Sequence, residues 1–436
     1  MCYAIPGRVE SIDDKIAVVD YFGERKKAIN ELDGLSPGDY IYAQGGYVIE
    51  KIPQREAQEI LAVWKETFFE LQEADLRLSG LAPKGAAEGR LSAILDKILD
   101  GGEPSRDDLI YMMAAEEPAQ AELIHKAANY LRRKHHGNAC CIHGIIEISN
   151  RCSRDCHYCG ISASNRGLER YRMTKEEIIS SAVEAAAKYN FKALVLQSGE
   201  NCGYDAGELA SMVKEIRSRH PMLIFVSFGE MTKPDLEALY AAGARGLLLR
   251  FETSNPALYG NLHPGHNLES RLGVLREARR IGYLIITGGL LGLPGQTDAD
   301  IADDLLLAKD LGADMFSFGP FLPHPATPLS SFSAPSKEKM LKVLSLARLI
   351  DPLKANVVVT TALETLDAGA RRDGLMGGAN SVMLNLTPLK YRNLYSLYPR
   401  RAHEGEEITV QIEETLALLR SIGRAPADLG IYHETN

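Results

Sequence analysis

Three cysteines lie within eight residues of each other and form the most reactive group of side chains in the sequence. Cys152, Cys156 and Cys159 follow the spacing C-x3-C-x2-C. Three thiolates can hold three irons of a [4Fe-4S] cubane and leave the fourth iron without a protein ligand. S-adenosylmethionine (SAM) can chelate that iron through its amino and carboxylate groups, and its reductive cleavage gives a 5'-deoxyadenosyl radical. The pattern therefore predicts a cluster that binds SAM.

A zinc knuckle is the alternative reading of these cysteines. Zinc sites of this kind need a second pair of Cys or His ligands, and no suitably spaced second pair occurs. Cys140, Cys141 and Cys202 are more typical of packed thiols. Cys140 and Cys141 are adjacent, so they are poorly spaced to hold a second cluster.

Two short glycine-containing turns are candidates for holding SAM. One follows a strand-like run and consists of Gln197, Ser198, Gly199 and Glu200. The other, residues 289–296, reads GLLGLPGQ, includes Leu293 and can present its backbone to the adenine. Because glycine-rich bends also occur without any ligand, neither turn is decisive alone.

Charged residues after the fourth strand-like run suit the polar groups of SAM. Glu252 can accept hydrogens from the ribose hydroxyls, and Arg250 or Arg271 can bind a carboxylate through two donors. A structural Arg-Glu pair at a barrel rim explains the same residues equally well. Thr360 and Thr361 read by themselves as β-branched strand residues.

The order of elements predicts the α/β class and a TIM-type (β/α)8 barrel. Amphipathic helices are expected at 174–188, 268–281, 297–311, 336–349 and 409–422. Parallel strands with right-handed crossovers close into a barrel at eight, and the active site then lies at their carboxyl ends. The eight strand-like runs are residues 144–149, 193–198, 223–228, 246–253, 283–288, 315–319, 357–362 and 381–386.

The first part of the chain reads as a separate small β-barrel followed by a helix. Strand-like runs at 17–21, 39–43 and 47–50 are separated by glycines, and a helix is expected over 54–76. Small residues then suggest a linker over 77–90, so the expected domains are 1–76 and 91–436. The second domain is expected to begin with helices, one of them capped by Ser105.

Composition indicates an ordinary globular protein in a reducing compartment. The 436 residues are 45% hydrophobic and 25% charged, with a formal net charge of -9. This balance argues against nucleic acid or an acidic membrane surface as a partner. No run approaches the length of a membrane span, and seven cysteines do not suit a disulfide framework, so we expect a cytoplasmic protein.

Several longer stretches of the second domain resemble the HydE family, radical SAM maturases of [FeFe]-hydrogenase that are related to biotin synthase and to the pyrrolysine enzyme PylB. The matching stretches are residues 171–177, 195–200, 248–256, 292–297, 319–329 and 391–399. The resemblance implies SAM contacts from Tyr158, Ser198, Gly199, Glu200, Ser227, Glu252, Arg271 and Leu293. It also implies a substrate cavity lined by Gln197, Arg250, Thr360, Thr361, Met383, Tyr395 and Tyr398.

Four positions depart from the HydE pattern. Phe225 and Leu290 stand where the family usually has Thr and Met near the cavity. Phe251 replaces a His, and His143 replaces an Arg just before the first strand. These departures bear on the identity of the substrate more than on the SAM chemistry.

The N-terminus resembles the HypC/HupF family, small [NiFe]-hydrogenase chaperones that carry an iron with cyanide and carbonyl ligands. The likeness rests on the opening MCYAIPGRV and on residues 38–40 and 46–52. Removal of Met1 would leave Cys2 with its thiolate and amine beside one metal ion, so Cys2 is a candidate iron ligand. HypC proteins usually have a His where Gln44 stands, and an amide offers a weaker ligand.

Three hypotheses follow from the sequence. The first is a maturase that acts on a small iron-cyanide-carbonyl or sulfur-containing precursor, with a reductant such as ferredoxin or flavodoxin and hydrogenase maturation proteins as partners. The second is a PylB-like amino-acid mutase or a biotin-synthase-like enzyme, although second-cluster cysteines for sulfur insertion are missing. The third is a non-enzymatic carrier of iron-sulfur clusters or iron fragments.

Overall fold

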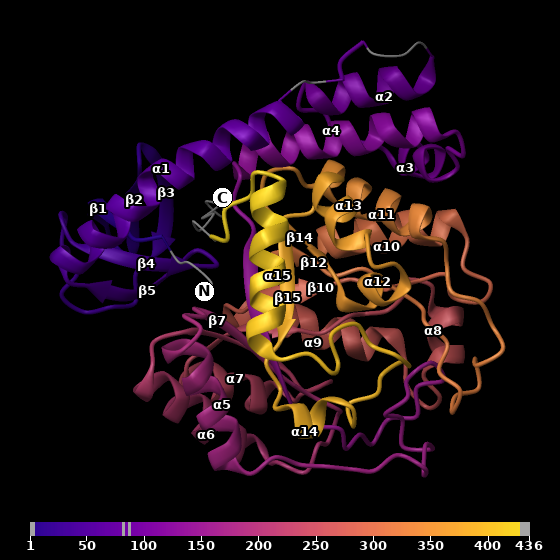
Figure 1. Cartoon of the computed structure of the whole chain (residues 1–436). Helices are drawn as coiled ribbons and strands as arrows, with labels where there is room; N and C mark the ends of the chain where they lie inside the picture. Colours follow the sequence, from indigo (N-terminus) through magenta and orange to yellow (C-terminus); the bar gives the residue numbers. More distant parts are fainter. Residues whose placement is uncertain (1–4, 81–82, 86–88, 428–436) are drawn as a thin grey trace.

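The computed structural model describes residues 5–80, 83–85 and 89–427. It contains two closed barrels, a small one of five strands and a large one of eight (Figure 1). The small barrel lies beside the large one, and a layer of helices extends from it across the large barrel. The fold expected from the sequence is confirmed.

The small barrel is antiparallel except for one contact between its third and fifth strands. Sequence analysis missed its first and third strands because GRVESID and ERKKAI carry several charged side chains, which weakens their apolar signal. The strands are β1 (Gly7–Asp13), β2 (Ile16–Tyr21), β3 (Glu24–Ile29), β4 (Tyr40–Gln44) and β5 (Tyr47–Ile52), ordered β1-β2-β3-β5-β4.

Four helices connect the barrels. The first of them continues three residues past the expected end at 76, and Ser105 accepts a hydrogen bond from the Asp108 amide, which confirms the predicted cap. In the part of the chain that the structure describes, every helix is too short or too polar to cross a membrane. These helices are α1 (Gln54–Ser79), α2 (Arg90–Leu99), α3 (Arg106–Met113) and α4 (Pro118–His136).

The large barrel is parallel and has the strand order β10-β12-β14-β15-β6-β7-β8-β9. All eight predicted strands are present. They are β6 (Cys141–Ser149), β7 (Ala193–Ser198), β8 (Leu223–Ser227), β9 (Ala244–Leu248), β10 (Leu284–Thr287), β12 (Met315–Phe316), β14 (Asn356–Val359) and β15 (Ser381–Asn385). A two-stranded extension pairs β11 (Leu290–Leu291) with β13 (Gly319–Pro320).

Helices follow these strands on the outside of the barrel. They are α5 (Lys175–Ala187), α6 (Ala206–Arg219), α7 (Lys233–Ala242), α8 (Pro256–Leu262), α9 (Leu268–Ile281), α10 (Asp298–Asp310), α11 (Lys337–Ile350), α12 (Thr361–Leu366), α13 (Ala370–Met376), α14 (Leu389–Arg392) and α15 (Ile408–Ser421). The predicted strand over 357–362 was too long. Its last residues start α12, because the Thr360 hydroxyl accepts from the Leu363 amide and caps that helix.

The small barrel closes the floor of the large one, where the parallel strands begin. The turn between β4 and β5 lies so close that a Cβ on Gly45 would be 2.6 Å from Leu223 Cδ2. Tyr47 and Ile49 share one apolar cluster with Leu223 and other residues from inside the large barrel. Ion pairs at the edge of this contact join Glu50 to Lys192 at 3.0 Å and Glu31 to Arg245 at 2.9 Å.

A buried ion-pair group fixes the helix that leaves the small barrel. Asp75 on α1 accepts two hydrogen bonds from Arg132 on α4, at 2.7 and 2.8 Å. Arg424, just beyond α15, lies 3.2 Å from the same carboxylate. All three side chains are buried, so the two guanidinium charges depend on Asp75 for compensation.

We therefore expect Asp75→Asn to lower the free energy of unfolding by about 3 to 5 kcal/mol, because it leaves buried positive charge uncompensated. Glu73→Gln is the matched control, since exposed Glu73 pairs only loosely with Arg77 at 3.6 Å. That control should change stability by less than about 0.5 kcal/mol. Urea unfolding at equal cluster content measures both. Equal stability of the two variants would contradict a structural role for the buried group.

Candidate active site

A cavity of about 290 Å³ lies at the carboxyl ends of the barrel strands. Segments at the ends of all eight strands contribute to its wall, as the barrel geometry predicts. The structure brings most predicted site residues together here: Cys152, Cys156, Tyr158, Cys159, Gln197, Ser198, Gly199, Glu200, Ser227, Arg250, Glu252, Arg271, Thr360, Thr361, Met383, Tyr395 and Tyr398. Two predicted residues are not in this set. Leu293 lies outside the lining, and Cys2 lies outside the described residues.

The cysteine loop follows β6 and presents three free, partly buried thiols to the cavity. Burial raises the pKa of the Cys156 thiol to about 12 and also raises the pKa values of Cys152 and Cys159. Such thiols ionise readily only when a cation takes the place of the proton, as an iron ion does. Their placement fits a cluster held by three thiolates.

The turn after β7 lies directly against this loop. A Cβ on Gly199 would be 2.3 Å from the Arg151 carbonyl oxygen and 2.6 Å from Cys152 Cβ, so only glycine fits there. The Ser153 amide donates to the Glu200 carbonyl at 2.8 Å. The turn and the first cluster cysteine are therefore positioned by the same contact.

The side chain of Glu200 is occupied by protein partners. Arg154 donates to it, and its Oε2 accepts from the Glu230 amide at 2.9 Å. Arg154 also lies 3.3 Å from the Glu230 carboxylate. The side chain thus stabilises the two loops, and it is the backbone of the turn that can receive a ligand. Arg154 and Glu230 carried no signal in the sequence.

Glu252 has two features that suit a ligand. It is buried, yet its Oε2 receives no hydrogen bond from the described residues and only lies 3.3 Å from Arg250. Its backbone has φ of 70°, an uncommon conformation outside glycine that often occurs at functional sites. A carboxylate oxygen held in this way can accept a hydroxyl hydrogen, which fits the predicted contact with a ribose.

Arg271 reaches the cavity from α9 and is held on two sides. Its Nε donates to the Tyr259 hydroxyl at 2.9 Å, and its Nη1 donates to the Arg250 carbonyl at 3.1 Å. Tyr158 lies next to it and contacts His263 Nε2 at 3.1 Å through its hydroxyl. Burial lowers the pKa of His263 to about 3, so this imidazole is neutral and the guanidinium is the positive group.

The run 289–296 is shaped by its own glutamine. Gln296 Oε1 accepts from the Gly292 amide at 2.9 Å, and its Nε2 donates to the Leu290 carbonyl at 3.0 Å. Leu293 packs in a small apolar cluster that includes Leu290 and Phe321. These contacts account for the bend without a ligand, and the adenine contact of Leu293 stays a prediction.

A buried ion pair that sequence analysis missed lies at the other side of the cavity. Glu147 on β6 pairs with Arg401, and Asn385 donates to Glu147 at 3.1 Å. The Arg401 guanidinium also lies over the rings of Tyr395 and Tyr398, at 5.6 and 5.9 Å from their centroids. This group can bind a small polar substrate against aromatic walls. No local pattern in the sequence links its members.

The four departures from the HydE pattern lie at different depths. Leu290 lines the cavity. Phe225 lies deeper in the barrel, and Phe251 is fully buried in the main core. His143 is buried further down β6, where its ring meets Phe225 edge to face at 5.3 Å. Only Leu290 can therefore change the shape of the cavity directly.

Two known protein families match separate parts of the chain. Residues 146–308 match the Radical SAM superfamily, and residues 1–64 match the HupF/HypC family. The [FeFe] hydrogenase maturase subunit HydE of Thermotoga maritima is 39% identical over 333 residues, which span 76% of this chain and 94% of that protein. The chain belongs to the HydE family. It is a radical SAM enzyme, and the family implies a [4Fe-4S] cluster and SAM.

Other relatives of this HydE-family chain are more distant. The 3-methylornithine synthase of Methanosarcina acetivorans is 28% identical over 76% of this chain and 93% of its own. The crystal structure of methylornithine synthase (PylB) has a TM-score of 0.67 at 26% identity and covers 77% of this chain and 97% of that one. Biotin synthases also match, which confirms the expected relationships.

We expect Gly199→Ala to weaken SAM binding by about 10- to 100-fold, the equivalent of about 1.4 to 2.7 kcal/mol, which is the usual size of an overpacking cost. The reason is that the new Cβ collides with the backbone of the cysteine loop. Gly273→Ala on α9 is the matched control, because a Cβ there meets nothing within 4 Å. Equilibrium dialysis with SAM, together with iron and sulfide contents, measures the effect. Wild-type affinity in Gly199→Ala would contradict the proposed role of this turn.

Proposed function

We propose that this enzyme uses its radical chemistry in the maturation of a hydrogenase-type metallocofactor. The substrate would be a small iron-cyanide-carbonyl or sulfur-containing precursor, and the small barrel would receive, deliver or dock it. The observation that supports the proposal is that the small barrel and the large barrel are joined on one chain. A HypC-like barrel is packed into the floor of a HydE-like barrel, and linking two sites on one chain raises the effective concentration of a labile intermediate.

The residues around the cavity have separable proposed roles. Cys152, Cys156 and Cys159 would hold the cluster. The Gln197–Glu200 turn, Ser227, Glu252 and Arg271 would position SAM. When bound and reduced, the cluster supplies the electron that cleaves SAM to the 5'-deoxyadenosyl radical. The surrounding protein keeps bulk water away from the reacting atoms, because most of these side chains are buried or half-buried.

The substrate side of the cavity is suited to a small charged molecule. Arg250 and Arg401 can attract an anionic group, while Met383, Tyr395 and Tyr398 offer apolar and aromatic surface. Gln197, Thr360 and Thr361 add hydrogen-bonding groups at the strand ends. An anionic iron complex with cyanide ligands would satisfy this combination.

An amino-acid substrate is the second candidate. The buried pair of Glu147 and Arg401 could bind an ammonium and a carboxylate together, as an enzyme similar to 3-methylornithine synthase would require. The two candidate substrate classes can be distinguished by measurement, because the correct class should accelerate SAM cleavage.

We expect anaerobically reconstituted protein to form 5'-deoxyadenosine from SAM and dithionite, and Cys156→Ala to form none, because it lacks one cluster ligand. Cys202→Ser is the control, since Cys202 is buried outside the cavity lining. A synthetic iron-cyanide-carbonyl complex should raise the rate by about tenfold, which corresponds to an activation free energy lower by roughly 1.4 kcal/mol. Acceleration by ornithine or lysine alone would favour the amino-acid alternative instead.

We further expect Cys2→Ala to lose an iron-bound cyanide and carbonyl fragment. Full-length protein loaded repeatedly with such a fragment should show Fe-CN and Fe-CO infrared bands, and Cys2→Ala should lose most of their intensity, because a thiolate ligand is removed. Cys140→Ser serves as the control cysteine substitution. Bands that persist undiminished in Cys2→Ala would rule out Cys2 as the iron ligand.

A further inference from the structure

Three potential metal ligands meet at the floor of the large barrel, at the end opposite to the cluster site. Cys141 Sγ lies 3.4 Å from Nδ1 and 3.6 Å from Nε2 of His143. Gln44 of the small barrel places its side-chain Nε2 3.3 Å from the same sulfur. We infer that Cys141, His143 and Gln44 form a binding site for one divalent, thiophilic transition-metal ion such as Fe²⁺, Co²⁺ or Zn²⁺.

The position of the pair inside the barrel is unusual. Side chains on a strand alternate, so Cys141 and His143 face the same interior as Ile145 and Glu147, which line the upper cavity. Barrel interiors are normally filled by branched aliphatic side chains, and the surrounding layer here does contain such residues. Cys141 and His143 thus place two side chains that can bind a metal ion in a layer otherwise rich in aliphatic residues.

The distances suit coordination. A metal ion with a sulfur at about 2.3 Å and a nitrogen at about 2.1 Å, in tetrahedral geometry, keeps the two donor atoms about 3.5 Å apart. Cys141 Sγ and the His143 nitrogens already have this separation. Ring rotation can turn either nitrogen toward the ion.

Gln44 can supply an oxygen to the same ion. The oxygen and nitrogen of an amide are assigned from neighbouring hydrogen bonds, and a half-turn of the group exchanges them. Binding would release the Cys141 thiol proton, leave the imidazole neutral and direct the Gln44 oxygen to the metal. The sulfur and nitrogen come from one barrel and the oxygen from the other, so the ion would join the two modules.

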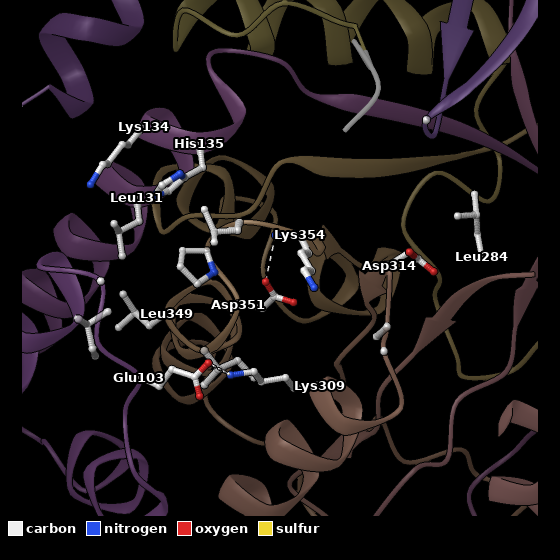
Figure 2. A pocket seen from close by; sticks show the side chains of 18 of the residues that line it. Glu103, Leu131, Lys134, His135, Leu284, Lys309, Asp314, Leu349, Asp351 and Lys354 are labelled. Carbon is white, nitrogen blue, oxygen red and sulfur yellow. Dashed lines mark hydrogen bonds and ion pairs between the residues drawn. The ribbon is translucent and has the colours of Figure 1, made fainter. Parts of the chain in front are cut away.

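A second cavity lies close to this site, although none of the three ligands lines it. This cavity of about 1030 Å³ lies between the floor loops and α4, and its wall includes Gly45 and Gly46, directly next to Gln44. Figure 2 shows the side chains around this space, among them Lys134 and His135 from α4 and Leu284 at the start of β10. The three ligands themselves are buried, with exposures of 3%, 1% and 5% for Cys141, His143 and Gln44. Exclusion of water strengthens coordination once the ion has entered.

Cobalt(II) titration of the full-length, cluster-loaded protein tests this site. Every protein in this titration also carries Cys2→Ala, which removes the other proposed thiolate ligand. The protein with no further change, the reference wild type, should bind one Co²⁺ at the floor with a sulfur-to-cobalt charge-transfer band in the near ultraviolet, read as a difference spectrum. Cys141→Ser should abolish that band, and His143→Gln should weaken binding by about a hundredfold, because each removes a strong ligand. The exposed or half-exposed group of His403, Glu406 and Glu414 contains no sulfur and cannot produce the band.

Cys140→Ser is the matched control, because Cys140 is the neighbouring cysteine and packs in the main core instead of the barrel interior. It should keep the band. Gln44→Glu supplies a second test if Cys141→Ser fails to fold, since a carboxylate is a stronger oxygen ligand and should tighten binding by about tenfold. No band in the wild type, an undiminished band in Cys141→Ser, or unchanged affinity in Gln44→Glu would overturn the inference.

This test is independent of the proposed function. Cobalt binding at the floor does not require SAM cleavage, and 5'-deoxyadenosine formation is measured at the other end of the barrel. Cobalt binding without 5'-deoxyadenosine formation would leave the floor site standing and contradict the proposed function. The reverse result would contradict only the floor site.

Discussion

Parallel closure of eight strands is the constraint on which the rest of this structure depends. Because every strand runs in the same direction, all carboxyl ends meet at one mouth and all amino ends at one floor. Loops of very different sequence position thereby converge on one cavity. The cysteine loop follows β6, the first strand of the large barrel, and Thr360 follows β14, the seventh strand of that barrel. Both nevertheless line the same cavity. A doubly wound sheet with the same helices would leave these segments on an open crevice.

The floor of the large barrel differs from its mouth. In this chain it is closed by another module, whose Tyr47 and Ile49 continue the apolar interior. Ile286, Met315 and Val358 separate the two ends with close-packed side chains. Polar chemistry is therefore restricted to the ends of the barrel.

Buried charges follow one pattern at the module junction and in the cavity. Arg132 and Arg401 each meet a carboxylate, and each also donates to a backbone carbonyl. A guanidinium has several donors in a fixed plane, so it can satisfy a carboxylate and the backbone at once. At the junction between the two barrels, the contacts of Arg132 hold α1 in place. In the cavity Arg401 orients Glu147 beside the substrate space.

Local patterns were sufficient to predict much of the fold and part of the site. The C-x3-C-x2-C spacing, the eight strands and the Ser105 cap depend on residues that are close in sequence, so composition and periodicity reveal them. The ends of strands were harder to predict. Thr360, for example, could extend a strand or cap a helix, and the surrounding structure determines which of the two it does. The charged strands β1 and β3 were missed for a related reason, since pairing with neighbours holds them in place.

The sequence by itself determined the barrel architecture and the relationship to two families, and it predicted the cluster ligands. Tertiary structure alone decided which distant residues meet. Glu147 and Arg401 are 254 positions apart, and Gln44 and Cys141 are 97 positions apart. Such contacts depend on how whole modules pack, and that packing is set by the apolar surface that Tyr47, Ile49 and Leu223 bury together. No local pattern carries that information.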